Sequence, residues 1–217
     1  MTAKTATEPR NIRLAPDRRA QIILDKSIEY IGRNGFAATM RELADYCGVS
    51  SGLILKYYGT KEQLLDQVFD SIFTDRWEEE RLAGLLDRSV PFRDRLKAFY
   101  GWFFDVIDDF NWIRTGIFSG LTNEELSRRH YELQVRRILE AVALELRHER
   151  GDDAALAGKP PEMWELEAAW TLHSTFIQWT NRKHVFGRPV WQDKAGVVDL
   201  VVDLFIDGCR ARPRKAD

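Results

Sequence analysis

The stretch from residue 39 to residue 62, TMRELADYCGVSSGLILKYYGTKE, constrains the fold more strongly than any other part of the chain. Thr39 precedes Glu42 by three residues, so each side chain can accept a hydrogen bond from the other residue's backbone N–H at a helix start. Gly48 ends the apolar pattern that follows, because glycine adopts a left-handed backbone conformation without steric cost. The spacing predicts a short helix with the inward positions Met40, Leu43, Ala44 and Cys47.

A second short helix is predicted directly after this turn. Ser50 is a good N-cap residue, and Ile54 and Tyr58 stand at the i and i+4 spacing of a buried face. Because Ala44 is small, the two helices can cross closely, which predicts a helix-turn-helix. A hairpin in an ordinary all-α core is the alternative, but the caps, the glycine and the exposed face together favour DNA binding. The outward residues of the second helix are Ser51, Gly52, Leu53, Lys56 and Tyr57.

Residues 18–65 resemble the DNA-binding domain of TetR-family transcriptional regulators. Two positions depart from the family pattern: Leu55 stands where tyrosine is usual, and Leu53 where a small residue is frequent. Since that tyrosine often holds the DNA backbone in the family, no phosphate contact is assigned to Leu55, and Tyr57 is expected to take part of that role. The residues that carry the resemblance are Arg19, Ile22, Ile23, Gly35, Phe36, Thr39, Leu43, Ala44, Gly48, Val49, Ser50, Gly52, Tyr58, Lys61 and Glu62.

The predicted DNA contacts lie on both short helices and at the start of a fourth one. Leu53 is expected at a thymine methyl group and Lys56 at a guanine edge or a phosphate. Thr60 can cap the fourth helix, where Lys61 and the free N–H groups would bind a phosphate. The predicted contact residues are Thr39, Arg41, Ser50, Ser51, Gly52, Leu53, Lys56, Tyr57 and Lys61. The N-terminal arm adds two alternatives, a solvated tail or DNA contacts by Lys4, Arg10 and Arg13.

The distribution of charge divides the chain into two parts. The formal net charge of −2 argues against a wholly basic surface for nucleic acid. Residues 1–62, however, contain 10 Lys and Arg against 7 Asp and Glu, whereas residues 63–217 contain 22 against 27. A basic head on an acidic body suits a protein that presents one end to phosphates. We therefore expect a helix-turn-helix domain with an N-terminal arm at 1–62 and an effector-binding and dimerisation domain at 63–217.

The sequence carries no signal for export or membrane insertion. The two cysteines, Cys47 and Cys209, lie far apart in the chain, so reduced thiols are expected and a disulfide is not. The N-terminal residues lack the apolar segment of a secretory signal. Because no run of about 18 apolar residues is present either, we expect a cytoplasmic protein.

The body is predicted to be helical throughout, which makes the fold class all-α. Thr122 and Glu125 repeat the capping-box spacing, so a long helix is expected to begin there and to run towards Arg147. The other expected segments are a continuation of the fourth helix over 61–73, a helix opened by Pro91, a shorter helix at 111–120, an exposed loop at 150–161 and two final helices at 162–184 and 192–210.

The body shows no pattern of catalytic or metal-binding residues. It has no phosphate-binding glycine loop, no GxSxG, no HExxH and no paired CxxC. His173 and His184 lie eleven residues apart on one predicted helix, which places them roughly 16 Å apart and excludes a shared metal. We therefore expect no enzymatic activity, no catalytic residue, no metal and no cofactor.

The aromatic content of the body is high, with 7 Trp and 12 Phe in the whole chain. These residues either pack a large core or line an apolar cavity for a small molecule, with a few polar groups for orientation. His173 is the polar residue most expected to face such a cavity. The predicted effector, of unknown identity, is apolar or aromatic, and its expected contacts are Trp102, Phe103, Ile107, Arg114, Phe118, Trp170, His173 and Phe176.

The two final helices are apolar on more than one face, which predicts a contact with a second subunit. The resemblance implies the same, since two C-terminal helices of each TetR-family protomer form a four-helix dimer interface. The sequence thus favours a homodimeric, ligand-responsive transcriptional regulator, a repressor released by a small molecule from a palindromic double-stranded DNA operator. The alternatives are a helical small-molecule-binding protein or enzyme whose body carries the activity, and a DNA-binding scaffold without a ligand.

Overall fold

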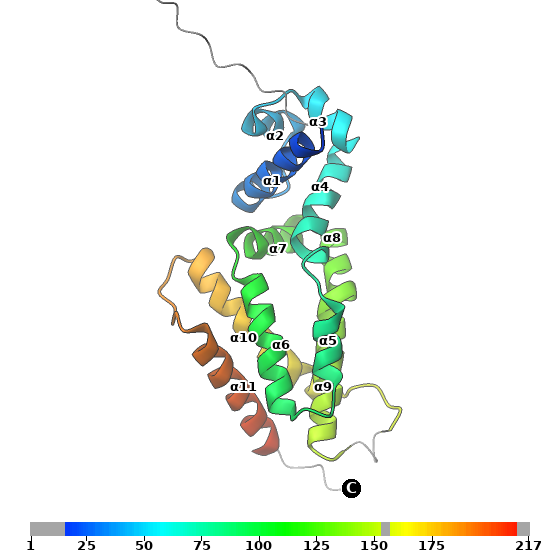
Figure 1. Cartoon of the computed structure of the whole chain (residues 1–217), viewed down its shortest axis with the longest axis vertical. Coiled ribbons are helices and arrows are strands. Elements are labelled where there is room, and N and C mark those ends of the chain that lie inside the picture. Colours follow the sequence, from blue (N-terminus) through cyan, green and yellow to red (C-terminus); the bar gives the residue numbers. More distant parts are fainter. Residues whose placement is uncertain (1–15, 153–156, 212–217) are drawn as a thin grey trace, which may run out of the picture.

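A computed structural model describes residues 16–152 and 157–211, and within these ranges every regular element is a helix (Figure 1). None of the helices in these ranges is long and apolar enough to cross a membrane. The predicted arm contacts Lys4, Arg10 and Arg13 lie outside the described residues. The elements are α1 (Pro16–Asn34), α2 (Met40–Cys47), α3 (Ser51–Tyr58), α4 (Lys61–Phe69), η1 (Asp70–Thr74), α5 (Glu79–Leu86), α6 (Phe92–Ile107), α7 (Phe110–Thr122), α8 (Glu124–His130), η2 (Tyr131–Val135), α9 (Arg136–Glu149), α10 (Met163–His184) and α11 (Lys194–Ala211).

The helices α1, α2 and α3 form a small head whose predicted caps are confirmed. The Thr39 backbone N–H donates to Glu42 Oε2 at 2.7 Å, and the Glu42 N–H donates to Thr39 Oγ1 at 3.2 Å. Gly48 ends α2 with φ at 70°, and Ser50 Oγ caps α3 by accepting from the Leu53 N–H. The fold class, an all-α chain that opens with a helix-turn-helix, is thus confirmed.

The core of the head joins all three helices. Tyr58 donates a hydrogen bond from its hydroxyl to the Ala20 carbonyl at 2.6 Å, which ties α3 to α1. Cys47 is buried beside the Ser27 hydroxyl, as expected for a small core residue. The remaining fully buried apolar side chains of the head include Ile23, Ile31, Leu43, Ala44 and Ile54.

The helix α4 runs from the head into the body (Figure 1). Thr60 caps it, and Gln63 completes a capping box. The predicted apolar stripe is confirmed, since Leu64, Leu65, Val68, Phe69, Ile72 and Phe73 are all buried. The last part of this stripe lies in η1, a π-helical turn that continues α4. One continuous helical segment therefore connects the head with the body.

The predicted capping box at Thr122 and Glu125 is wrong. Thr122 still belongs to α7, and its hydroxyl donates to the Phe118 carbonyl at 2.7 Å. Asn123 caps α8 instead, with its Oδ1 accepting from the Leu126 N–H at 3.2 Å. The physical reason is that a threonine inside a helix can bond the carbonyl four residues before it, which leaves the cap to the next polar side chain.

Two buried ion pairs hold the body helices in place. Glu145 on α9 binds Arg95 on α6 at 2.7 Å, and Arg88 reaches the same carboxylate at 2.9 Å. Arg147 on α9 binds Glu165 on α10 through two contacts of 3.0 and 2.5 Å. Because both members of these α9 pairs are nearly inaccessible, the pairs fix the orientation of the helices more than they add net stability.

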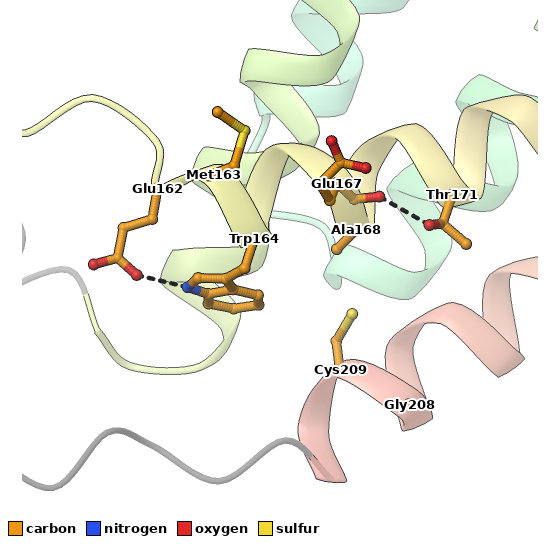
Figure 2. A pocket seen from close by; sticks show the side chains of 8 residues that line it. All are labelled: Glu162, Met163, Trp164, Glu167, Ala168, Thr171, Gly208 and Cys209. Carbon is orange, nitrogen blue, oxygen red and sulfur yellow. Dashed lines mark hydrogen bonds between the residues drawn. The ribbon is translucent and has the colours of Figure 1, made fainter.

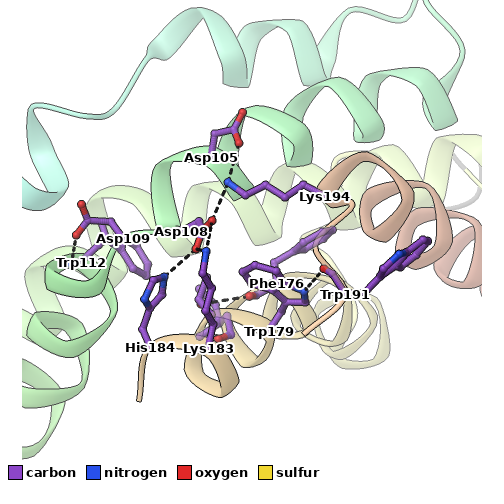
Figure 3. A network of polar contacts seen from close by, with 12 residues as sticks. Asp105, Asp108, Asp109, Trp112, Phe176, Trp179, Lys183, His184, Trp191 and Lys194 are labelled. Carbon is purple, nitrogen blue, oxygen red and sulfur yellow. Dashed lines mark hydrogen bonds and ion pairs between the residues drawn. The ribbon is translucent and has the colours of Figure 1, made fainter. Parts of the chain in front are cut away.

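A polar network lies at the junction of α6 and α7 (Figure 3), on the side of the body that faces the head in Figure 1. Asp108, between α6 and α7, accepts from Lys183 at 2.7 Å and from His184 Nε2 at 2.8 Å, and it pairs with Lys194 at 2.9 Å. Burial opposes ionisation of Asp108, but these hydrogen bonds outweigh it and hold the pKa of the carboxyl below its usual range. The network therefore ties the α6–α7 junction to the end of α10 and the start of α11.

Candidate functional site

The exposed surface of α2 and α3 carries most of the predicted DNA contacts. Five of the nine side chains or glycine backbones are exposed, and four are half-buried. The exposed ones are Thr39, Arg41, Ser50, Gly52 and Lys56, and the half-buried ones are Ser51, Leu53, Tyr57 and Lys61. Gly52 has no atom within 4 Å of the place where a Cβ would stand, so another molecule can approach the backbone there closely.

Two of the predicted contact residues, Thr39 and Ser50, already serve as the N-caps of α2 and α3. The Thr39 hydroxyl accepts from the Glu42 N–H and donates to Glu42 Oε2 at 2.8 Å. Hydrogen bonds from Thr39, with a smaller effect from the charge of Lys61, hold the pKa of Glu42 below its ordinary value. Lys61 is half-buried at the start of α4, where Thr60 Oγ1 accepts from the Gln63 N–H.

The structure distinguishes Leu53 from Leu55. Leu53, predicted to meet a thymine methyl group, is half-buried and packs against the core of the head. Leu55, which was not among the predicted contacts, is 43% exposed. The helical spacing could have predicted that Leu55 shares the exposed face, because it follows Gly52 by three residues and Ser51 by four. Leu55 and Lys56 are the exposed residues that follow Gly52 on α3.

Four of the predicted effector residues come together in the body. Phe103, His173 and Phe176 are buried, and the Phe103 and His173 rings lie 4.7 Å apart. Trp170 contacts His173 at 6.2 Å, and Phe176 joins the cluster through Tyr100. Ile107 is buried further along α6, and Trp102 is half-buried against Trp77.

Arg114 and Phe118 are placed elsewhere, at the contact between α7 and α1. Arg114 Nε donates to the Gly32 carbonyl at 2.6 Å, and Nη2 donates to the Arg33 carbonyl at 3.2 Å. The Phe118 ring lies against Gly35, where φ is 80° and an added Cβ would approach the ring to 2.9 Å. These two residues therefore join the head to the body, since they bind the last turn of α1.

Alanine is expected to have opposite effects at Gly32, which lies in this contact, and at Gly101, which lies outside it. In Gly32→Ala the new Cβ would lie 2.5 Å from Asn111 Oδ1 and 3.2 Å from its Cα, so we expect a loss of about 1–3 kcal/mol of unfolding free energy. Gly101→Ala in α6 meets nothing within 4 Å and should gain up to about 1 kcal/mol. Urea unfolding of both variants checks this. Equal stability of Gly32→Ala and wild type would show that α1 and α7 are not packed in solution.

Two open depressions lie on the body, and none of the predicted effector residues lines either. The larger, of about 910 Å³, is a groove between α10 and α11 in which Cys209 faces Ala168 (Figure 2). The smaller, of about 380 Å³, lies between α6 and α11. The larger is lined by Glu162, Met163, Trp164, Glu167, Ala168, Thr171, Gly208 and Cys209, and the smaller by Lys97, Gly101, Asp105, Lys194, Ala195, Val198 and Asp199.

Among the buried polar groups of the body without a hydrogen-bond partner are Tyr100 Oη, Thr115 Oγ1, His130 Nδ1 and His173 Nδ1, and the rings of Tyr100, His130 and His173 belong to the aromatic cluster. Only His173 was predicted. His130 follows the inward residue Leu126 by four residues, which is the signal that could have found it. Each such group costs about 1–3 kcal/mol compared with a hydrogen-bonded one.

Burial keeps both histidines neutral. It lowers the pKa of His130 to about 4. Burial, with a smaller effect from a charge on His130, lowers the pKa of His173 to about 3. At neutral pH the cluster therefore presents uncharged donors and acceptors, because each neutral imidazole has one of each.

These pKa values predict that the protein loses stability in mild acid. The histidines of the unfolded chain take up protons near pH 6.5, whereas the folded chain resists protonation down to about pH 4 at His130 and about pH 3 at His173. The unfolded state thus binds more protons between about pH 6.5 and 4, and stability falls by up to about 1.4 kcal/mol per pH unit for each histidine. Urea unfolding at about pH 7.5, 6 and 5 measures this slope. The variant His130→Gln/His173→Gln should have a smaller slope, and an unchanged slope would contradict the assignment.

Comparison with known proteins supports the identification of the head. The sequence profile of the family described as "Bacterial regulatory proteins, tetR family" matches residues 23–68. The HTH-type transcriptional repressor Rv3405c of Mycobacterium tuberculosis is 29% identical over 102 residues, 45% of this chain and 54% of that protein. The HTH-type transcriptional regulator BetI of Agrobacterium fabrum is 33% identical over 81 residues, 37% of this chain and 38% of that protein. The chain thus spans about half the length of these curated relatives, or less.

Solved structures resemble the whole chain in fold. The fatty acid degradation regulator FadR from Bacillus halodurans covers 89% of this chain and 97% of its own length, with a TM-score of 0.62 and 18% identity. A TetR-family regulator from Mesorhizobium loti covers 92% and 98%, with a TM-score of 0.59 and 19% identity. At these identities the likeness concerns the fold alone. The capped helix-turn-helix and the profile match at residues 23–68 identify the head as a DNA-binding domain of the type found in the TetR family of bacterial regulatory proteins.

Proposed function

We propose that this chain is a DNA-binding transcriptional regulator that is released from a palindromic operator by a small molecule. The observation that carries the proposal is the exposed surface of α2 and α3, which presents Arg41 on α2 and both Lys56 and the unobstructed Gly52 backbone on α3. A short helix that presents small and basic groups fits the major groove. Repression is the sign we propose, because the relative Rv3405c is named a transcriptional repressor.

The proposed dimer uses the outer faces of α10 and α11. Several apolar residues of these two helices, among them Leu172, Trp179 and Val202, are buried inside the chain. Leu200 and Leu204 on α11 remain exposed, at 52% and 66%, and follow one another at i and i+4. Met163 on α10, at the rim of the groove in Figure 2, is 72% exposed. A second copy would cover this apolar surface, and its two-fold axis would place two recognition helices in successive major grooves.

The proposed coupling between effector and operator uses α4 and α7. The helix α4 begins at the DNA-facing side with Lys61 and ends among buried residues of the body. The helix α7 carries Trp112 on the side of the aromatic cluster and Arg114 on the side of α1. An effector that shifts these helices would change the spacing of the two heads, with a coupling free energy on the order of 1–3 kcal/mol. We propose that residues 1–62 bind DNA and that residues 63–217 bind the effector and form the dimer.

The test is selection of bound duplexes from a random DNA library by the purified full-length chain. We expect enrichment of an inverted repeat and, by light scattering, a complex of two chains or a multiple of two per operator. Enrichment of no sequence at moderate salt would overturn the regulator proposal in favour of a helical binding protein or enzyme. Enrichment of a site without two-fold symmetry would overturn the dimeric part of the proposal alone.

A further inference from the structure

The four polar groups without partners converge on one region of the body. The Phe103 ring lies 4.7 Å from His173, 6.0 Å from Tyr100 and 6.4 Å from Trp112. Trp112 in turn lies 6.1 Å from His130. Tyr100, His130 and His173 thus surround a centre made of Phe103 and Trp112.

The position of Thr115 fits the same centre. Thr115 follows Trp112 by three residues on α7, so both side chains lie on the same face of that helix. Its hydroxyl is completely buried, as is that of Tyr100, and His173 is 3% exposed. Three elements of the body, α6, α7 and α10, therefore each contribute one nearly inaccessible polar side chain without a partner. The end of α8 contributes the fourth, His130.

Their common environment is aromatic and uncharged. Phe73 contacts His130 at 4.5 Å, and Tyr100 stacks on Phe176 at 4.8 Å. The two imidazoles are neutral at physiological pH, and the two hydroxyls can donate or accept. A charged ligand would lose its hydration here and gain no opposite charge from these four groups. An uncharged ligand with a polar oxygen would instead supply the missing partners.

A route to the surface is available beside His173. Trp170 is half-buried, contacts His173 at 6.2 Å and stacks on Tyr131 at 6.2 Å. Tyr131 is 37% exposed. Rotation of these two rings would open the cluster between α10 and η2 without moving a helix.

We propose that Tyr100, Thr115, His130 and His173 are the polar groups of an internal ligand site that takes an uncharged, mainly aromatic molecule carrying a hydroxyl or carbonyl oxygen. As the effector site, it deepens the proposed function and rests on it for its regulatory role, but not for ligand binding itself. In the ligand-free chain the aromatic rings occupy the site, and the ligand displaces them while satisfying the four groups.

The test compares three probes of one shape: 2-acetylnaphthalene, 2-naphthoate and naphthalene. Binding to the full-length chain is followed by calorimetry and by quenching of tryptophan fluorescence at about pH 7.5. We expect the ketone to bind about 10-fold more tightly than the carboxylate or the hydrocarbon. Failure of the ketone to bind up to its solubility, or tighter binding of the carboxylate, would overturn the proposal.

Two variants locate the site. Tyr100→Phe removes one hydroxyl and keeps the ring, and His173→Phe keeps a ring of similar size. Each should weaken binding of the ketone about 5-fold or more, while Tyr100→Phe raises the melting temperature of the free protein because a buried unpartnered hydroxyl is lost. Tyr46→Phe, on the head, is the matched control and should change neither quantity. Unchanged affinity in both site variants would place the ligand elsewhere and overturn the assignment.

The same protein samples separate this proposal from the proposed function. The selected operator duplex is titrated with and without the ketone. Binding of the ketone with the expected variant pattern, together with unchanged operator affinity, supports the internal site and overturns its role as effector site. Selective ketone binding by a chain that selects no operator supports the site and overturns the regulator proposal. Release of the operator by the ketone supports both.

Discussion

The variant Arg41→Glu/Lys56→Glu is expected to bind the selected operator about 100-fold more weakly than the wild type, or worse. Both side chains are exposed on the face of α2 and α3 and have no role in the core of the head. Each cation that contacts a phosphate or a guanine edge contributes about 1–3 kcal/mol, and a glutamate in its place adds repulsion from the DNA. The slope of log affinity against log salt concentration should also fall by about 4, because each of the two subunits on the operator loses two phosphate contacts. Gel-shift or fluorescence titration at several salt concentrations measures both quantities.

A matched control separates this effect from net charge. Lys159→Glu/Arg188→Glu makes the same change of net charge at two exposed residues of the body. We expect the control to bind the operator within about 3-fold of the wild type, since charges beyond about 10 Å are largely screened. Both double variants should melt close to the wild type, because surface substitutions of this kind rarely change stability by more than about 0.5 kcal/mol. Equal weakening in the two variants would mean that the DNA-binding surface has been misplaced.

Glu165→Ala is expected to lower the free energy of unfolding by about 3–5 kcal/mol, which is the largest stability effect that we predict. The carboxylate is 1% exposed and binds Arg147, which is 3% exposed, through two contacts. It also accepts from the Glu162 N–H at 2.6 Å, so its loss removes a cap of α10 as well. Arg147 would keep a buried charge without its carboxylate partner. For a chain of this size the melting temperature should fall by about 10 °C.

Two further variants show whether the buried charge is the cause. Glu167→Ala removes an exposed carboxylate from the same helix and should leave the melting temperature within about 2 °C of the wild type. Arg147→Met/Glu165→Leu replaces both charges by apolar side chains and should recover most of the lost stability. If Glu165→Ala melts together with Glu167→Ala, the ion pair contributes nothing and the prediction fails. Thermal melts followed by circular dichroism are sufficient for all three variants.

The head could be predicted from the sequence because its signals are local. The capping box of Thr39 and Glu42, the left-handed Gly48 and the N-cap Ser50 each involve residues at most three positions apart. Such hydrogen bonds form within one turn of a helix and depend little on the rest of the chain. The apolar stripe of α4 was predictable for a similar reason, since helical spacing alone places its residues on one face.

The body was predicted less completely because its decisive contacts join distant residues. Arg114 was assigned to the effector site from its position on an aromatic helix, but its guanidinium binds carbonyl groups of α1 more than 80 positions earlier. The partners of Glu165 and Asp108 are likewise on other helices. No pattern in the sequence links Tyr100, Thr115 and His130, because they lie on three different helices, α6, α7 and α8, whose packing is known only from the structure.

The sequence by itself determined the helix-turn-helix, its caps and the all-α class, because these follow from hydrogen bonds and apolar spacing within single turns. Only the tertiary structure decided which side of each body helix faces which neighbour. It placed Arg114 against α1, left Leu200 and Leu204 uncovered, and gathered Tyr100, His130 and His173, each with an unpartnered polar atom, around Phe103 and Trp112. The physical reason is that an aromatic stripe buries equally well against several neighbours, so its partners are selected by packing and by buried charge pairs over the whole chain.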